Sequence, residues 1–145
     1  EQISDLFHRA EVGHLGTYSE DGYPYILPMH FVYYDNKIYM HGLAKGKKID
    51  NIKFNSSVCF EIDEMISLLY EGVENPCDVN TEFNSIILKE TESLVSNFNE
   101  KHAALSKIVE KFTPHLKNKE LPEKMVKGTA VIRIDILDYV GRYYK

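Results

Sequence analysis

The stretch that decides the fold is residues 13–63, GHLGTYSEDGYPYILPMHFVYYDNKIYMHGLAKGKKIDNIKFNSSVCFEID. It contains three runs rich in β-branched and aromatic residues, separated by the turn signals SEDG and DNK. These runs predict a three-stranded meander at residues 12–18, 23–34 and 38–42. A short helix is expected next, because Ile49 and Ile52 recur at helical spacing, and a further strand follows at 57–63.

The rest of the chain adds helices at both ends of this core and two later strands. Helices are predicted at 3–10 and 99–113, where apolar residues fall on one face, and Pro114 stops the second. Strands are predicted at 83–96 and 128–141, a loop at 71–82, and a loop at 114–127 with one helical turn at 122–127. Without regular β-α-β alternation, the pattern favours a mainly β (α+β) fold: a six-stranded antiparallel barrel, closed or half-closed, with a few flanking helices.

Composition narrows the function classes. A chain of 145 residues with 43% hydrophobic residues is expected to form a single domain over 1–145. The net charge of −5 argues against a nucleic-acid-binding surface. No apolar run is long enough to cross a membrane and no signal segment opens the chain, so a cytoplasmic protein is expected. Cys59 and Cys77 have no metal-ligand spacing, and Cys59 is predicted to be a small buried residue.

The segment 39–55, YMHGLAKGKKIDNIKFN, resembles a phosphate-binding turn in which a strand leads through glycine and lysine into a helix. A nucleotide P-loop is excluded, because only three residues separate Gly42 from Gly46 and Lys48 stands where Ser or Thr would bind Mg²⁺. What remains is a phosphate grip made by Gly46, Lys47, Lys48 and the helix start. The alternative of a solvated helix end stays open, although lysines at a helix N-terminus oppose the dipole unless an anion is present.

Motifs along 13–63 resemble the FMN-binding split barrels that are similar to pyridoxamine 5'-phosphate oxidase, in the branch of nitroimidazole-resistance reductases. The motifs are LGT, DGYPY, PMHFVY, IYMH, GKKIDNI and VCFEID, in that order, and FNSIILKETESLV with EKHAALSKIVEKFTP matches more weakly. The resemblance implies a homodimeric six-stranded split barrel with FMN at the subunit interface. It also implies a flavin-dependent oxidoreductase that takes hydride from NADH or NADPH and reduces a small oxidised or nitroaromatic acceptor.

The resemblance also assigns the cofactor site. Lys47, Lys48 and the helix start would meet the FMN phosphate, and the path of the ribityl chain would be lined by His41, Gly42 and Leu43. The strand beneath the flavin ring would supply largely backbone contacts, from Pro28, Met29, His30 and Phe31. Two features depart from the branch: His30 replaces a small polar residue, and LKETE follows SII where a glycine is expected. The C-terminal VGRYYK lacks the substrate segment of a pyridoxine-phosphate oxidase, so vitamin B6 oxidation is not expected.

Two histidines on the predicted strands keep further functions open. His41 or His30 could donate a proton to a reduced acceptor, because imidazole titrates near neutral pH, and His41 is the candidate catalytic residue. The alternative for either one is an interior histidine with its hydrogen bonds satisfied. His41 is also the candidate axial ligand if haem replaces flavin; no other metal site is expected. A third reading is a split barrel that binds a cofactor without catalysis and acts in binding or sensing. His14, among small residues, is predicted to be packed with its ring N–H bonded to backbone.

Overall fold

The computed structural model describes the backbone of residues 2–137 and 140–144, with side chains from residue 4 to residue 137. Its α-helices are α1 (Gln2–Arg9), α2 (Lys47–Phe54), α3 (Phe98–Phe112) and α4 (Glu123–Gly128), and two short 3₁₀ turns lie at Pro76–Asp78 and Pro114–Leu116. Its strands are β1 (Val12–Tyr18), β2 (Pro24–His30), β3 (Val32–Tyr34), β4 (Lys37–Gly42), β5 (Ser57–Leu69), β6 (Asn80–Leu94), β7 (Ala130–Asp135) and β8 (Val140–Tyr144).

The strands form one antiparallel sheet in the order β2-β1-β5-β6-β7-β4-β3, with β8 paired to β6 beside this path. The first and last strands of the path are not hydrogen-bonded to each other, so the sheet curves without closing. This mainly antiparallel arrangement with few helices confirms the predicted split-barrel class. Seven strands lie on the path, where the sequence predicts six.

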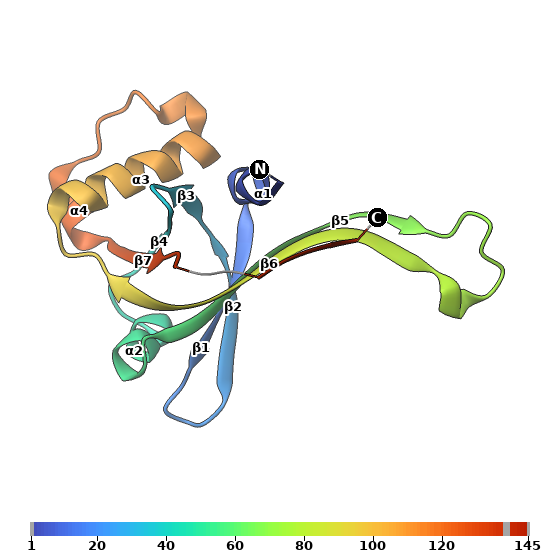
Figure 1. Cartoon of the computed structure of the whole chain (residues 1–145). Helices are drawn as coiled ribbons and strands as arrows, with labels where there is room; N and C mark the ends of the chain where they lie inside the picture. The colour runs from blue at the N-terminus through green and yellow to red at the C-terminus, as the bar shows by residue number, and fades with distance from the viewer. Residues whose placement is uncertain (1, 138–139, 145) are drawn as a thin grey trace.

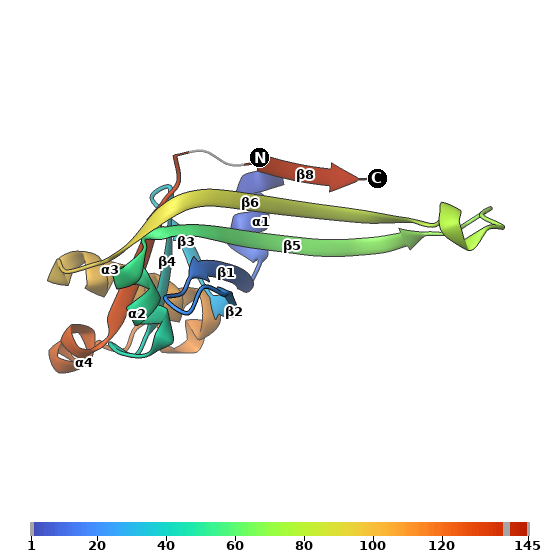
Figure 2. The ribbon, with the colours of Figure 1, turned by 90° about the horizontal axis from the view of Figure 1, so that it is seen from below.

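The shape is a curved body with a long two-stranded arm (Figures 1 and 2). β5 and β6 pair over their whole lengths, and their distal halves extend away from the helices. α3 and α4 lie together on the opposite side of the body, and β8 runs along the outside of β6. The helix predictions are confirmed in place, but β5 extends six residues beyond the predicted strand end, from position 63 to Leu69.

Two predicted strands are each divided in two. The run 23–34 breaks at Phe31, so that β2 pairs with β1 while β3 pairs with β4, and the three-stranded meander is wrong. Phe31 itself is fully buried in the core at the point where the chain changes from one pairing to the other. The run 128–141 ends as β7 at Asp135 and resumes as β8 at Val140, which pairs with β6 instead. Residues 138–139 of that prediction lie outside the described residues.

The core lies inside the curve of the sheet. Its largest cluster combines strand residues with Leu6 and Phe7 from α1 and with Ile49 and Ile52 from α2. A second cluster lies on the opposite side of β4 and β7, where Val131 and Tyr39 pack under Ala104 and Ile108 of α3. β7 is therefore covered on both faces, and its Ile132 and Ile134 are fully buried on the inner one.

Cys59 is exposed, and its predicted burial is wrong. Its neighbours Val58 and Phe60 both point into the core, and successive side chains of a strand point to opposite faces, so Cys59 faces outward. The same alternation places Gly16, Ile26 and Lys89 opposite or beside it on the outer face of the sheet. In the described part of the chain, no helix is both long and apolar enough to span a membrane.

Candidate functional site

The start of α2 has the geometry that the sequence predicts for an anion-binding turn. β4 ends at Gly42, and three residues lead from it to Gly46, the residue that precedes the helix. Gly46 has φ 127°, a backbone conformation that favours glycine, and no side chain caps the helix. The first N–H groups of a helix have no intrahelical partner, so they remain available to a ligand at this end.

Lys48 turns from the helix start toward the inside of the sheet. Its ammonium group lies against Gly42, in the space that a Cβ at residue 42 would fill. Partial burial lowers the pKa of Lys48, and the negative charge of Glu92 opposes this change. The lysine predicted to meet a phosphate therefore lies against β4, partly buried.

Glu92 of β6 is the acidic residue whose charge acts on the pKa of Lys48. Its side chain is 3% exposed, and neither carboxylate oxygen has a hydrogen-bond partner. Burial raises the pKa of Glu92 to about 7, while the charge of Lys48 acts in the opposite direction. An unpartnered buried carboxyl carries a desolvation penalty, so this corner of the core is electrostatically costly. The sequence gives one signal for it, the two acidic residues Glu90 and Glu92 within the strand run 83–96.

Lys47 points elsewhere. Its Nζ lies 3.1 Å from Oδ2 of Asp21 and 5.5 Å from the centre of the Tyr25 ring. The backbone N–H of Tyr23 and then the Lys47 ammonium hold the pKa of Asp21 below its ordinary value. The structure does not bring the two predicted phosphate-binding lysines together, because consecutive residues on a helix point about 100° apart.

His41 lies on the exposed side of β4, close to the Lys48 end of the helix. Partial burial lowers its pKa, and the charges of Lys48 and then His30 add to the effect. His30, at the end of β2, has its Nδ1 3.3 Å from the carbonyl of Glu11 and its ring edge-on to Phe112. The charges of Lys48 and His30 thus both act on the pKa of His41, although the three residues come from three different elements.

The other residues predicted to contact the flavin differ in the solvent exposure of their side chains. Pro28 is exposed on the outer face of β2, whereas Met29 and Phe31 are buried in the core. Leu43 is 78% exposed in the turn after β4. Met29 and Phe31 could meet a ligand only through their backbone, as the sequence analysis predicts for this strand.

A groove with room for a small molecule lies apart from these residues. It measures about 630 Å³, which is within the range of small-molecule sites, and it runs over the outer face of the sheet. It is lined by Gly16, Thr17, Tyr18, Pro24, Ile26, Ser57, Val58, Cys59, Lys89, Glu90, Thr91 and Leu137. Sequence reasoning missed this groove; the available signal was the run of apolar residues at outward-facing positions of β1 and β2.

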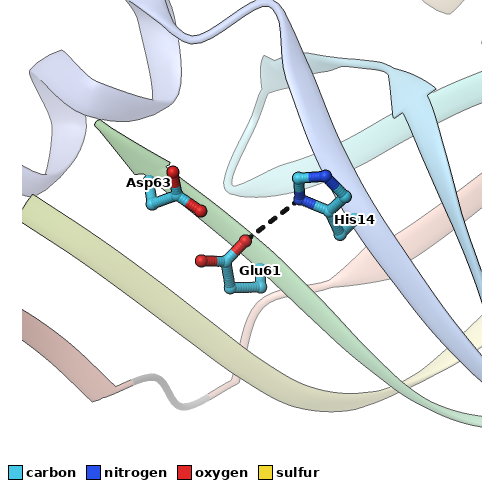
Figure 3. A group of neighbouring side chains, drawn as sticks. All are labelled: His14, Glu61 and Asp63. Atoms are coloured by element: carbon cyan, nitrogen blue, oxygen red, sulfur yellow. Dashed lines mark hydrogen bonds and ion pairs between the residues drawn. The ribbon is translucent and has the colours of Figure 1, made fainter. Parts of the chain in front are cut away.

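A separate polar group lies on the same outer face (Figure 3). Nδ1 of His14 lies 3.2 Å from Oε1 of Glu61, and a carboxylate oxygen of Asp63 lies within 4.8 Å of both groups. Burial and then Asp63 raise the pKa of Glu61 to about 7, and His14 acts in the opposite direction. The His14 side chain is 50% exposed and faces a carboxylate, so the predicted packed histidine bonded to backbone is wrong.

A family model described as "Pyridoxamine 5'-phosphate oxidase" matches residues 1–143. The chain belongs to this pyridoxamine 5'-phosphate oxidase family. The match covers both halves of the sheet and all four α-helices, so the family resemblance drawn from residues 13–63 is confirmed. No curated protein matches the chain.

Solved structures share the fold of this pyridoxamine 5'-phosphate oxidase family member at low identity. A candidate 5-nitroimidazole antibiotic resistance protein from Bacteroides thetaiotaomicron has 22% identity and a TM-score of 0.81, with 97% of this chain and 81% of that chain covered. The flavocytochrome Anf3 from Azotobacter vinelandii has 18% identity and a TM-score of 0.84, over 99% and 66%. A FAD and haem binding protein from Mycobacterium smegmatis has 13% identity and a TM-score of 0.85, over 99% and 70%.

Proposed function

We propose that this chain is an FMN-dependent oxidoreductase that reduces a small oxidised or nitroaromatic acceptor with electrons from NADH or NADPH. The observation that carries the proposal is the match of the family model over residues 1–143. Similar folds in a candidate nitroimidazole resistance protein, a flavocytochrome and a FAD and haem binding protein support a flavin-type cofactor. FMN is the specific proposal because the motifs along residues 13–63 resemble those of FMN-binding split barrels.

The phosphate group would bind at the start of α2. Gly46 leaves the helix end without a side-chain cap, and Lys48, the second residue of the helix, lies within the first turn that carries the uncapped N–H groups. Gly42 keeps open the space that the Lys48 side chain crosses. In the proposed complex the Lys48 ammonium leaves the neighbourhood of Glu92 for the phosphate, where its positive charge is better compensated. Lys47 contributes mainly backbone N–H, since its side chain is bonded to Asp21.

The ring would lie beside the exposed ends of β2 and β4. Pro28 and His30 offer side chains and backbone on β2, and His41, Gly42 and Leu43 continue the surface to the helix start. Bound FMN would supply hydride acceptance from the nicotinamide and electron delivery to the acceptor. His41 would pass a proton from solvent to the reduced acceptor, because its lowered pKa leaves the ring mostly neutral at rest and makes the transiently protonated ring a stronger acid.

The proposed enzyme is a homodimer. Tyr18, Ile26 and Leu137 are 58%, 69% and 85% exposed along the groove on the outer face of the sheet. Exposed apolar surface of this kind is typical of protein interfaces, and a second copy seated there would cover it. We propose a cytoplasmic location as well, from the sequence alone.

Haem is the second candidate cofactor. The lowered pKa of His41 keeps its imidazole neutral at neutral pH, which is the form that binds iron. The side chain is also exposed at the end of a strand, so a planar ligand has access to its ring. This reading keeps the fold and the location of the site and changes the prosthetic group.

The test is a visible spectrum of the purified protein before and after addition of FMN or hemin. Bands near roughly 375 and 450 nm that bleach on anaerobic addition of NADH or NADPH would support the flavin enzyme, and restoration by a nitroaromatic acceptor would complete the assignment. A band near roughly 400–420 nm that is lost in His41→Ala would assign haem instead. Tight FMN binding without turnover of any acceptor would contradict the enzyme and leave a cofactor-binding or sensing protein.

A further inference from the structure

The group formed by His14, Glu61 and Asp63 is positioned by the register of two strands. His14 of β1 lies directly opposite Glu61 of β5, and Asp63 follows two residues later on the same face of β5. One potential ligand atom from each residue lies within 4.8 Å of the other two. Figure 3 shows the imidazole of His14 directed at the two carboxylates from the neighbouring strand. Rigid paired strands therefore hold three potential metal ligands in one place.

The charge of this group is not balanced by a permanent cation. Other carboxylates have one: Glu64 is paired with Arg9, Glu100 with Arg133 and Asp21 with Lys47. Within residues 4–137, no lysine or arginine forms an ion pair with Glu61 or Asp63. Two carboxylates at this separation repel each other, and the imidazole compensates them only when it is protonated. A bound cation would remove the repulsion at any pH at which the three groups are deprotonated.

We propose that His14, Glu61 and Asp63 bind a divalent transition-metal ion of the Zn²⁺ type. An imidazole nitrogen and two carboxylate oxygens form a donor set that suits Zn²⁺, whereas Mg²⁺ and Ca²⁺ prefer oxygen ligands alone. Ligand atoms bound to one Zn²⁺ at about 2.0–2.1 Å lie roughly 3.4 Å apart. The His14 and Glu61 atoms are already at that spacing, at 3.2 Å, so only the Asp63 carboxylate has to approach.

The position of the site gives it access to small molecules. The next row of the same sheet face, two residues along, contains Gly16 and Cys59, which line the groove. Three protein ligands leave one position of a tetrahedral ion open, as in catalytic zinc sites. The groove begins one row away from the three ligands, so an oxygen or nitrogen donor from whatever occupies it, a small molecule or the proposed second copy, could complete the coordination. This proposal does not rest on the flavin, since none of its ligands belongs to the proposed FMN site.

The experiment is isothermal titration of tag-free, chelator-treated protein with ZnCl₂. One Zn²⁺ is expected per chain, with affinity reduced at least tenfold in His14→Gln and in Asp63→Asn. His115→Gln, a change of an exposed histidine outside the cluster, serves as the matched control and should bind as the wild type does. Copper-loaded protein should show hyperfine coupling from a single imidazole nitrogen in its electron paramagnetic resonance spectrum, and His14→Gln should abolish it.

Three results would overturn the proposal. They are no Zn²⁺ binding, unchanged binding in both cluster variants, or an equal loss in His115→Gln. Circular dichroism of each variant without metal separates loss of binding from loss of fold. Both cluster positions are exposed, so the variants are expected to fold. Titration of the FMN-loaded protein should give the same stoichiometry, which keeps the metal result separate from the flavin proposal.

Discussion

The ammonium group of Lys48 lies against Gly42, in the space that a β-carbon at residue 42 would occupy. The strand residue and the helix residue are therefore coupled. Gly42→Ala should displace the flexible end of Lys48 without breaking the pairing of β4 with β7. If Lys48 binds the FMN phosphate, we expect FMN affinity to fall on the order of tenfold, since a charge-assisted hydrogen bond is worth about 1.5–3 kcal/mol.

Gly128→Ala is the matched control for this substitution. A β-carbon at residue 128 would meet nothing within 4 Å, so it should leave FMN affinity unchanged. Quenching of flavin fluorescence during titration with each variant measures the two dissociation constants for FMN. Equal FMN affinities in the two variants would show that Gly42 is not part of the FMN site.

Charge reversal at residue 48 provides the more severe test. Lys48→Glu should abolish FMN retention during purification, because it places a carboxylate near the phosphate and beside Glu92. Lys53→Glu changes the same charge on the last turn of the same helix, where the side chain is exposed. The flavin-to-protein ratio by absorbance should be near zero in the first variant and unchanged in the second. Retention of FMN by folded Lys48→Glu would contradict the phosphate site.

The strands themselves could be predicted from the sequence because one face of the sheet is buried. In β1, exposed and buried positions alternate, with Leu15 buried next to the exposed His14, and α3 begins after Asn97, whose side chain caps it. The same alternation places Cys59 outward, between the buried Val58 and Phe60, although cysteine is by type most often an interior residue.

Other features depend on which distant strands pair with each other, and the local sequence pattern does not contain that information. The run 23–34 has no turn signal at Phe31, and only the two different partners of β2 and β3 divide it. His14 and Glu61 are 47 residues apart, so only the register of β1 against β5 brings them together. The direction of the Lys48 side chain likewise depends on Gly42 of β4 and Glu92 of β6, two strands that are far apart in the sequence.

Glu92 should make the stability of the fold depend on pH. Its pKa is raised from an ordinary 4.5 to about 7, so the folded chain holds a proton that the unfolded chain releases. Stability from this group is therefore fully present below about pH 4.5 and is lost as pH rises through about 7. Glu92→Gln should raise the free energy of unfolding by about 1–3 kcal/mol at pH 8 and leave it nearly unchanged at pH 4.5.

Urea denaturation at the two pH values measures this difference. Glu120→Gln, an exposed position, serves as the control and should change neither value. A Glu92→Gln variant with the same increase at both pH values would show that the gain does not come from titration of the carboxyl group.

Tyr39, Glu100 and Arg133 connect α3 to the sheet. The Tyr39 hydroxyl donates to Glu100 at 2.7 Å, and Nη1 of Arg133 donates to both oxygens of that carboxylate at 2.9 Å. Tyr39→Phe removes a hydrogen bond to a charged acceptor next to buried surface and should cost about 1–2 kcal/mol of unfolding free energy. Tyr33→Phe removes a 3.3 Å bond to Asn36 at an exposed site and should cost less than about 0.5 kcal/mol. Equal costs for the two phenylalanine variants would mean that the α3 contact is not a significant source of stability.

The proposed dimer can be tested at Ile26. This residue is 69% exposed, lines the groove, and lies on β2 at the edge of the sheet path, where a second copy would cover it. Ile26→Arg should convert the dimer to a monomer in size-exclusion chromatography with light scattering, because a buried guanidinium without a partner is costly. Met125→Arg introduces the same charge at a 61% exposed apolar residue on α4, away from that face, and should leave the dimer intact.

If FMN binds at the interface, the Ile26→Arg monomer should also lose FMN while Met125→Arg keeps it. An Ile26→Arg protein that remains dimeric would place the interface on another surface, and the exposed apolar residues of the β5–β6 arm would be the next to test.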